Sequence, residues 1–169
     1  NDDLKTVWWP LPTDDDAESW RLRAQAWEHP NVMIGGSDAG AHLDRMAGAP
    51  YTTAWLADCL RGRQLTSMEN AIRHLTDVPA RLFGFTGRGR IAEGWHADIV
   101  VFDPETVGAT DVELVFDLPG GSKRLWSEAT GISRVLVNGV VSVADGTATG
   151  AIAGKVMRAG VDTETVTAS

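Results

Sequence analysis

One short apolar segment constrains the fold of this chain more than any other feature. Residues 32–34 read VMI and lead directly into GGSDAGAH at residues 35–42. An unbroken apolar run of this kind is typical of a strand buried on both faces of a parallel sheet. Such a strand needs a hydrogen-bonded neighbour on each side, because its backbone groups cannot satisfy one another. The next strand-like segment begins only at Arg90, so we expect residues 32–35 to belong to a sheet whose other strands lie outside this chain.

Helical periodicity flanks this segment on both sides. The spacing of apolar residues predicts helices over residues 17–28, 51–61, 68–76 and 78–84. Asp16 is placed to cap the first of these helices, and Thr66 or Ser67 is placed to cap the third. Trp20 and Trp27 lie on one stripe of the first helix, where we expect them to serve packing.

After Gly84 the pattern changes from helical to extended. Strand-like runs occupy residues 90–91, 98–102, 135–137 and 140–143. Asn138-Gly139 between two valine-rich runs is a strong signal for a two-residue hairpin turn. Residues 103–131 have no sustained period and predict a long irregular excursion, and the Thr- and Ser-rich end from Asp162 is expected to fray.

Composition excludes several classes of partner. Fifteen Lys and Arg against 23 Asp and Glu give a formal net charge of −8, and no basic run occurs. We therefore expect neither nucleic acid nor an anionic membrane as a partner, because both require clustered positive charge. No apolar stretch approaches the roughly 20 residues of a membrane span. Cys59 is the only cysteine, which rules out an intrachain disulfide and indicates a reducing compartment, the cytoplasm.

Asp38 is the strongest candidate for chemistry. It follows the predicted buried strand at the end where α/β folds keep catalytic groups, and small residues around it leave room for a ligand. Its carboxylate could bind a divalent metal or accept the proton of an activated water. His42 follows four residues later and could enter the same pocket. The alternative reading is structural: Asp38 caps the next helix and His42 lies on the surface.

The other three histidines favour structural roles. His29 precedes a proline at a helix end, His74 lies within a predicted helix, and His96 lies in a turn. None has a second ligand at a useful spacing, and a zinc site needs three or four ligands.

Several segments together resemble the metal-dependent amidohydrolases. The closing helices of that family are similar to LTSMENAI at residues 65–72 and to TDVPARLFG at residues 76–84. The strands that follow resemble GRGRIAEGWHADIVVFDP at residues 87–104 and VLVNGVV at residues 135–141. The pattern is most similar to the N-acyl-D-amino-acid deacylase branch, also called D-aminoacylases, and it extends over residues 31–160.

This resemblance implies a (β/α)8 barrel with a small β-sandwich. The chain would then be an α/β fragment. Residues 1–86 would form the last barrel strand and the helices after it, residues 87–160 part of the sandwich, and residues 161–169 a flexible tail. Most of the barrel, including the family's His-x-His pair, has no counterpart in this sequence.

The resemblance also assigns roles to two residues. Asp38 matches the family's aspartate after the eighth barrel strand, which ligates a divalent metal, typically zinc, and acts as the general base. His42 would lie near the carboxylate or amide of the substrate. Of the metal ligands of the family, only Asp38 remains here.

Two functions follow from these observations. The chain is either the C-terminal part of an amidohydrolase that cleaves the C–N bond of an N-acyl-D-amino acid or a related small amide, or a non-catalytic module derived from one. In the first case its partner is the missing N-terminal part of the enzyme and the chain alone is inactive. In the second, its apolar faces pack against a partner or a second copy. The metal content of the purified chain discriminates between these readings.

Overall fold

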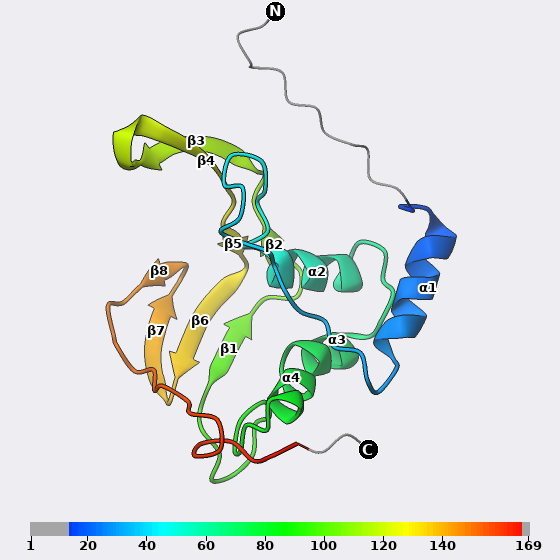
Figure 1. The fold of residues 1–169 in the computed structure, drawn as a ribbon, viewed down its shortest axis with the longest axis vertical. Coiled ribbons are helices and arrows are strands. Elements are labelled where there is room, and N and C mark those ends of the chain that lie inside the picture. Colours follow the sequence, from blue (N-terminus) through cyan, green and yellow to red (C-terminus); the bar gives the residue numbers. More distant parts are fainter. Residues whose placement is uncertain (1–13, 167–169) are drawn as a thin grey trace, which may run out of the picture. The chain divides into compact units, whose positions relative to one another are not determined.

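The computed structural model describes residues 14–166, which divide between two compact units, residues 1–32 and residues 33–169 (Figure 1). In the first unit the described part is built on α1 (Ala17–Trp27). Asp16 caps this helix, because its Oδ1 accepts a hydrogen bond from Ser19 N at 3.0 Å. The predicted helix and its cap are confirmed. Trp20 and Trp27 are half-buried, and none of the residues of α1 is fully buried.

The second unit opens with three helices. They are α2 (Tyr51–Leu60), α3 (Met68–Leu75) and α4 (Asp77–Leu82). Ser67 is the cap of α3, where its hydroxyl accepts a hydrogen bond from Asn70 N. Thr66, the alternative cap, instead accepts a bond from the Asn70 side chain at 2.8 Å. All three predicted helices are confirmed to within a few residues at their ends.

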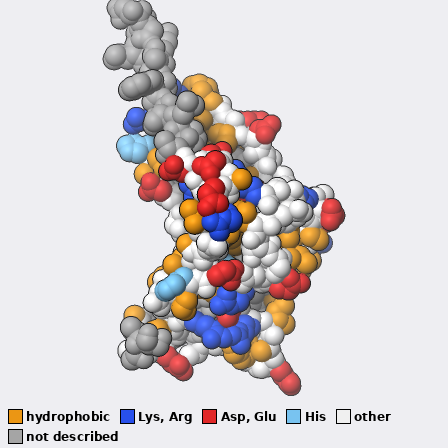
Figure 2. Space-filling model, turned by 90° about the vertical axis from the view of Figure 1, so that its right-hand side faces the viewer, with side chains coloured by type: hydrophobic (Ala, Val, Ile, Leu, Met, Phe, Trp, Pro, Cys, Tyr) orange, Lys and Arg blue, Asp and Glu red, His pale blue; other side chains and the backbone are white. Residues whose placement is uncertain are grey.

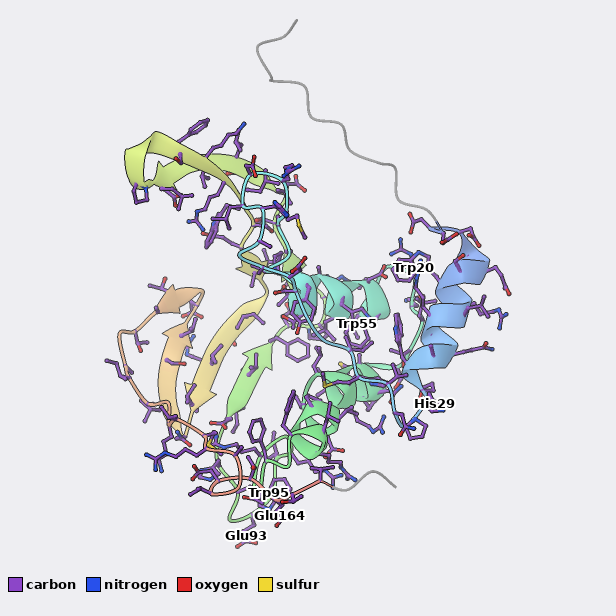
Figure 3. The ribbon with its side chains drawn as sticks, viewed as in Figure 1. Trp20, His29, Trp55, Glu93, Trp95 and Glu164 are labelled. Carbon is purple, nitrogen blue, oxygen red and sulfur yellow. The ribbon has the colours of Figure 1, made fainter. Side chains whose placement is uncertain are left out.

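The core of this unit joins the helices to the strands that follow. Trp55 extends from α2 toward α3 (Figure 3), where its ring meets the buried His74 edge-on at a centroid distance of 6.3 Å. Partly buried side chains such as Phe102 and Ile132 pack against a small cluster of buried apolar residues. This cluster consists of Leu56, Cys59, Ala71 and Val107.

Four antiparallel strands form the main sheet in the order β1-β6-β7-β8 (Figure 1). They are β1 (Ile99–Phe102), β6 (Ile132–Val137), β7 (Val140–Ala144) and β8 (Thr147–Ala148). Val137 pairs with Val140 across the turn, in which Asn138 and Gly139 have φ of 49° and 80°. Two left-handed residues in succession are the mark of a type I′ turn. The predicted hairpin is confirmed.

The excursion between β1 and β6 is more regular than predicted. It contains a short pair, β2 (Gly108–Ala109) with β5 (Ala129–Thr130), and a longer hairpin of β3 (Glu113–Leu118), η1 (Pro119–Gly121) and β4 (Ser122–Trp126). The residues of β3 and β4 are exposed or half-buried, and their sequence lacks the regular alternation of apolar and polar residues by which a strand is recognised. The prediction of an irregular segment is therefore wrong for this hairpin.

Two predicted strands are absent from the described residues. Residues 32–35 have no regular secondary structure and belong to no sheet among residues 14–166, and Val32, Met33 and Ile34 are only half-buried. The pairing partners expected for this strand lie outside this chain, so its place in a larger sheet stays a prediction. Residues 90–91 are also irregular, and the prediction of a strand there is wrong; Arg90 instead forms an ion pair with Asp77 of α4 at 2.6 Å.

Near its end the chain returns to the helices. Thr163 forms an isolated antiparallel bridge with Phe85, and Glu164 N donates a hydrogen bond to Gly84 O at 2.8 Å. The expected fraying from Asp162 onward includes residues 167–169, which lie outside the described residues. None of the helices in residues 14–166 has both the length and the apolar character to cross a membrane.

Candidate functional site

Asp38 lies on an open loop between residues 32–35 and α2. Its backbone is left-handed, with φ of 51°. Beside it, Ser37 Oγ accepts a hydrogen bond from Ala39 N at 3.1 Å. The Asp38 side chain is exposed, and within residues 14–166 no hydrogen bond or ion pair engages its carboxylate. The carboxylate is therefore open to a ligand.

The structure contradicts the alternative reading of Asp38 as a helix cap. The next helix, α2, begins at Tyr51, and its cap position is Pro50, which makes no side-chain hydrogen bond to the helix. Residues 39–49 separate Asp38 from that position. Capping therefore does not explain this aspartate.

His42 lies on a tight turn of the same loop. Its carbonyl oxygen accepts hydrogen bonds from Arg45 N at 2.8 Å and Met46 N at 2.9 Å, and its own φ is 48°. The Arg45 guanidinium lies 3.3 Å from Nδ1 of the His42 ring. His42 is exposed, in agreement with the surface reading, and its contact with a substrate stays a prediction.

Two close approaches hold this loop in shape. Leu125 N, on β4, donates a hydrogen bond to Leu43 O at 2.7 Å. At the other end, a Cβ on Gly48 would lie 2.0 Å from Ser37 O, so only glycine lets the loop return this close to its start. The sequence analysis missed both contacts; Gly48 was the available signal, but nothing in the sequence indicates that it meets Ser37.

The described residues do not form a metal centre. Among residues 14–166, no group of three or more His, Cys, Asp or Glu side chains could hold a metal ion. Asp38 would supply a single ligand, and a catalytic zinc takes about three from the protein. The residues present therefore do not fit a metal unless further ligands come from outside this part of the chain.

Cys59 is no candidate nucleophile. Its side chain is 3% exposed within the core. Burial, and to a lesser degree the carboxylate of Asp58, raises the pKa of the Cys59 thiol to about 11. A thiol with this pKa is protonated at neutral pH and unreactive.

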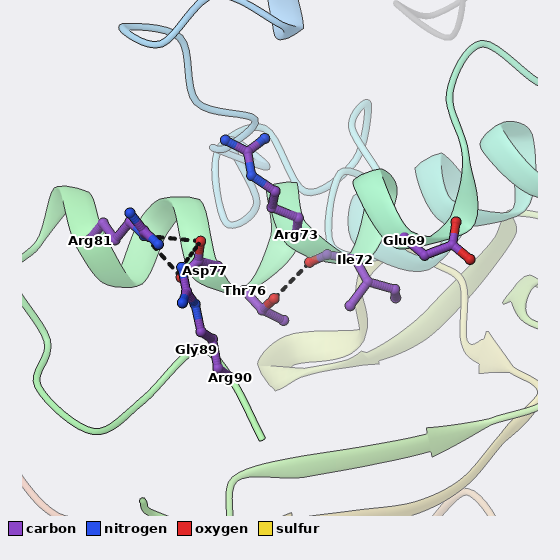
Figure 4. A pocket seen from close by; sticks show the side chains of 8 residues that line it. All are labelled: Glu69, Ile72, Arg73, Thr76, Asp77, Arg81, Gly89 and Arg90. Atoms are coloured by element: carbon purple, nitrogen blue, oxygen red, sulfur yellow. Dashed lines mark hydrogen bonds and ion pairs between the residues drawn. The ribbon is translucent and has the colours of Figure 1, made fainter. Parts of the chain in front are cut away.

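A hollow of about 430 Å³ lies at a different place, between α3, α4 and residues 89–90 (Figure 4). Arg73, Arg81 and Arg90 line it together with Asp77. The sequence analysis did not single out this group, because Arg90 comes from a loop and reaches the helices only in the folded chain.

Comparison with models of known protein families shows the family to which the chain belongs. The model of the amidohydrolase family matches residues 18–143. The chain belongs to this amidohydrolase family. The matched region includes the loop of Asp38 and His42 as well as the hairpin at Asn138-Gly139.

The curated relatives of this chain include several deacylases. An N-acyl-D-glutamate deacylase of Alcaligenes xylosoxydans xylosoxydans is 35% identical over 67% of this chain and 22% of its own length. An N-acyl-D-aspartate deacylase of the same organism is 38% identical over 74% of this chain and 23% of its own length. The amidohydrolase chain therefore spans less than a quarter of the length of these two relatives.

One solved structure agrees with this relationship. The N-acyl-D-glutamate deacylase of Bordetella bronchiseptica, determined with zinc and a phosphonate inhibitor that mimics the tetrahedral intermediate, is 32% identical. Its similarity covers 78% of this chain and 26% of that enzyme, with a TM-score of 0.56. The fold of the amidohydrolase chain is therefore an α/β part of a deacylase architecture.

Proposed function

We propose that this chain is part of an enzyme that hydrolyses the amide bond of an N-acyl-D-amino acid. The observation that carries the proposal is the chemistry shared by its relatives, because the D-glutamate and D-aspartate deacylases differ in substrate side chain but cleave the same kind of bond. A third relative, 34% identical, is a D-aminoacylase, and its name indicates the same kind of substrate. The substrate class is therefore an N-acyl-D-amino acid, without a defined side chain.

In this proposal Asp38 is the general base. Its open carboxylate accepts a proton from the attacking water as the water oxygen bonds to the amide carbon. The same proton then passes to the nitrogen as the C–N bond breaks, which releases the free amine and the carboxylic acid. His42, four residues away on the same loop, would contact the carboxylate or amide of the substrate.

A divalent metal, proposed as zinc by analogy with the Bordetella enzyme, would need ligands from beyond the described residues.

We further propose the architecture implied by the family. Residues 1–86 would close a (β/α)8 barrel, residues 87–160 would belong to a β-sandwich, and residues 161–169 would be a tail. Residues 32–35, which join no sheet here, support this, because the half-buried apolar side chains of residues 32–34 are what a strand of a larger sheet would show without its neighbours.

A second candidate function is a non-catalytic module that packs against a partner or a second copy. It is favoured by the large apolar side chains left in the open, some of which lie on the face shown in Figure 2. Ile152 is 98% exposed and Phe116 on the β3–β4 hairpin is 66% exposed. Exposed apolar surface is a usual mark of an interaction site.

The test uses the complete enzyme that contains this segment. Release of the free amino acid from N-acetyl-D-glutamate, N-acetyl-D-aspartate and their L-isomers is measured before and after removal of metal. Hydrolysis restricted to the D-isomers and abolished by chelation is the expected result. A complete protein that hydrolyses neither D-compound with metal supplied would favour the non-catalytic module.

Cytoplasmic location, proposed from the single free Cys59, is tested by fractionation of the cells.

A further inference from the structure

The hollow between α3 and α4 carries a positive surplus in an acidic chain. Its charged lining consists of three guanidinium groups, from Arg73, Arg81 and Arg90, against two carboxylates, from Glu69 and Asp77. The surplus of one positive charge contrasts with the net charge of −8 of the whole chain. The proposed hydrolysis does not use any of these residues.

Asp77 holds one of the three arginines firmly and another loosely (Figure 4). Arg90 makes a two-point contact, with Nε 2.6 Å from Oδ1 and a terminal nitrogen 3.0 Å from Oδ2. Arg81 donates only through Nε, at 3.0 Å, and its side chain is 66% exposed. A guanidinium has five N–H donors, so Arg81 keeps most of its donors for another acceptor.

Arg73 is also available. Within the described residues its side chain makes one long contact, from a terminal nitrogen to Asn70 Oδ1 at 3.4 Å. Arg73 and Arg81 therefore flank the hollow with unused donors, while Arg90 and Asp77 form a fixed base. Ile72 is the one large apolar residue in the lining, which favours a small and strongly polar ligand over an apolar one.

We propose that this hollow binds a phosphate group. A phosphate is tetrahedral and offers several oxygens, so it accepts hydrogen bonds from guanidiniums on different elements at once. Three arginines around one open hollow suit a single phosphate, whereas an extended polyanion would meet the acidic remainder of the chain. The ligand is inorganic phosphate or a phosphate monoester, which present the same chemistry.

Isothermal titration calorimetry on the whole 169-residue chain tests this site without any measure of hydrolysis. Inorganic phosphate and glycerol 2-phosphate are titrated separately at constant ionic strength. We expect one saturable site, weakened about tenfold by Arg73→Gln and by Arg81→Gln, since each removes a charge-assisted hydrogen bond. Tighter binding of glycerol 2-phosphate identifies a monoester as the ligand, tighter binding of inorganic phosphate identifies the free ion, and equal binding shows that the site recognises only the phosphate group that they share.

Arg134→Gln is the matched control. Arg134 is also a half-exposed arginine with one carboxylate partner, Asp145 at 2.5 Å, but it lies in β6 away from the lining. Its substitution should leave phosphate binding unchanged. Equal weakening by Arg134→Gln, or no saturable binding to the wild-type chain, would overturn the proposal. Arg73→Gln keeps the test valid if loss of the Arg81–Asp77 ion pair unfolds α4, and circular dichroism verifies the fold of each variant.

Discussion

At the scale of the residue, Asp38 is held in an unfavourable backbone conformation. A left-handed φ costs an L-residue about 1–2 kcal/mol, although aspartate tolerates it better than most. Both Asp38, at 51°, and His42, at 48°, adopt it on one loop. Strain of this kind is retained where the surrounding structure enforces it, and it concentrates at functional sites. The loop is enforced here by Gly48 and by the bond from Leu125.

Substitution of Asp38 tests the proposed general base in the complete enzyme. Asp38→Asn keeps size and shape but removes the basic oxygen, so kcat should fall by about 10²–10⁴-fold with a much smaller change in KM. Steady-state kinetics at saturating metal measure the effect.

Asp44→Asn is the control for that experiment. Asp44 is an exposed aspartate of the same loop, and its one ion pair, to Arg45, is long at 3.9 Å. Its substitution should leave kcat nearly unchanged. If the Asp38→Asn enzyme keeps more than about a tenth of wild-type turnover, Asp38 is not the general base.

At the scale of the element, the β6–β7 hairpin depends on its turn. Asn138 and Gly139 supply the two left-handed residues, and the Asn138 side chain adds a bond from Nδ2 to Ala153 O at 2.6 Å. Asp98, just before β1, accepts a hydrogen bond from Asn138 N at 2.8 Å and forms an ion pair with Arg88. The turn therefore ties the start of β1 to the end of β6, which lies beside it in the sheet.

Gly139→Ala should destabilise the chain by about 1–2 kcal/mol, because alanine does not share the ease of glycine at a φ of 80°. Space is not the cause, since the added Cβ would meet the nearest atom, in Ala97, at 3.9 Å. Urea unfolding measures the change. Gly154→Ala is the control, because that glycine is neither left-handed nor within 4 Å of an obstructing atom.

The Asp98 network makes the stability of this hairpin depend on pH. Burial tends to raise the pKa of Asp98, but the bond from the Asn138 amide and the Arg88 guanidinium outweigh it, so the pKa is lowered on folding. A lowered pKa contributes stability that is present above the unfolded value of about 3.9 and is lost as the pH falls through the folded value.

We therefore expect the difference in unfolding free energy between wild type and Asp98→Asn to be constant from neutral pH to about pH 5 and to shrink below about pH 4. Urea unfolding of both proteins, at pH values from neutral to below about pH 4, measures this difference. A difference that grows on acidification would contradict the assignment. Comparison with the variant isolates Asp98 from other carboxylates whose pKa is also lowered, such as that of Asp117 beside Arg124.

At the scale of the whole molecule, the proposed site needs groups from beyond the described residues. Its matched relatives are more than four times as long as the matched segment, and residues 14–166 contain no group of metal ligands. The half-buried residues 32–34 and the exposed apolar side chains on the strands are consistent with surface that a larger protein would cover.

The purified 169-residue chain should therefore not hydrolyse N-acetyl-D-glutamate, even with zinc added, and should bind no stoichiometric zinc. Amino-acid release and metal content after dialysis are the two measurements. Hydrolysis by the chain alone that a chelator abolishes would show that the described residues form a complete centre after all.

The sequence by itself determined the local structure and the family. Helix caps such as Asp16 and Ser67, and the turn at Asn138-Gly139, are encoded by residues within a few positions of one another, so they were predictable from the chain order. The family pattern was also readable, because it consists of contiguous segments.

Only the tertiary structure decided how distant residues meet. The β3–β4 hairpin, the bond from Leu125 to Leu43 and the ion pair of Arg90 with Asp77 join segments that no local pattern relates. The strand predicted at residues 32–35 stays a prediction for the same reason. An apolar run expresses the tendency to form a strand, but pairing is a property of the neighbours, and the described residues do not supply them.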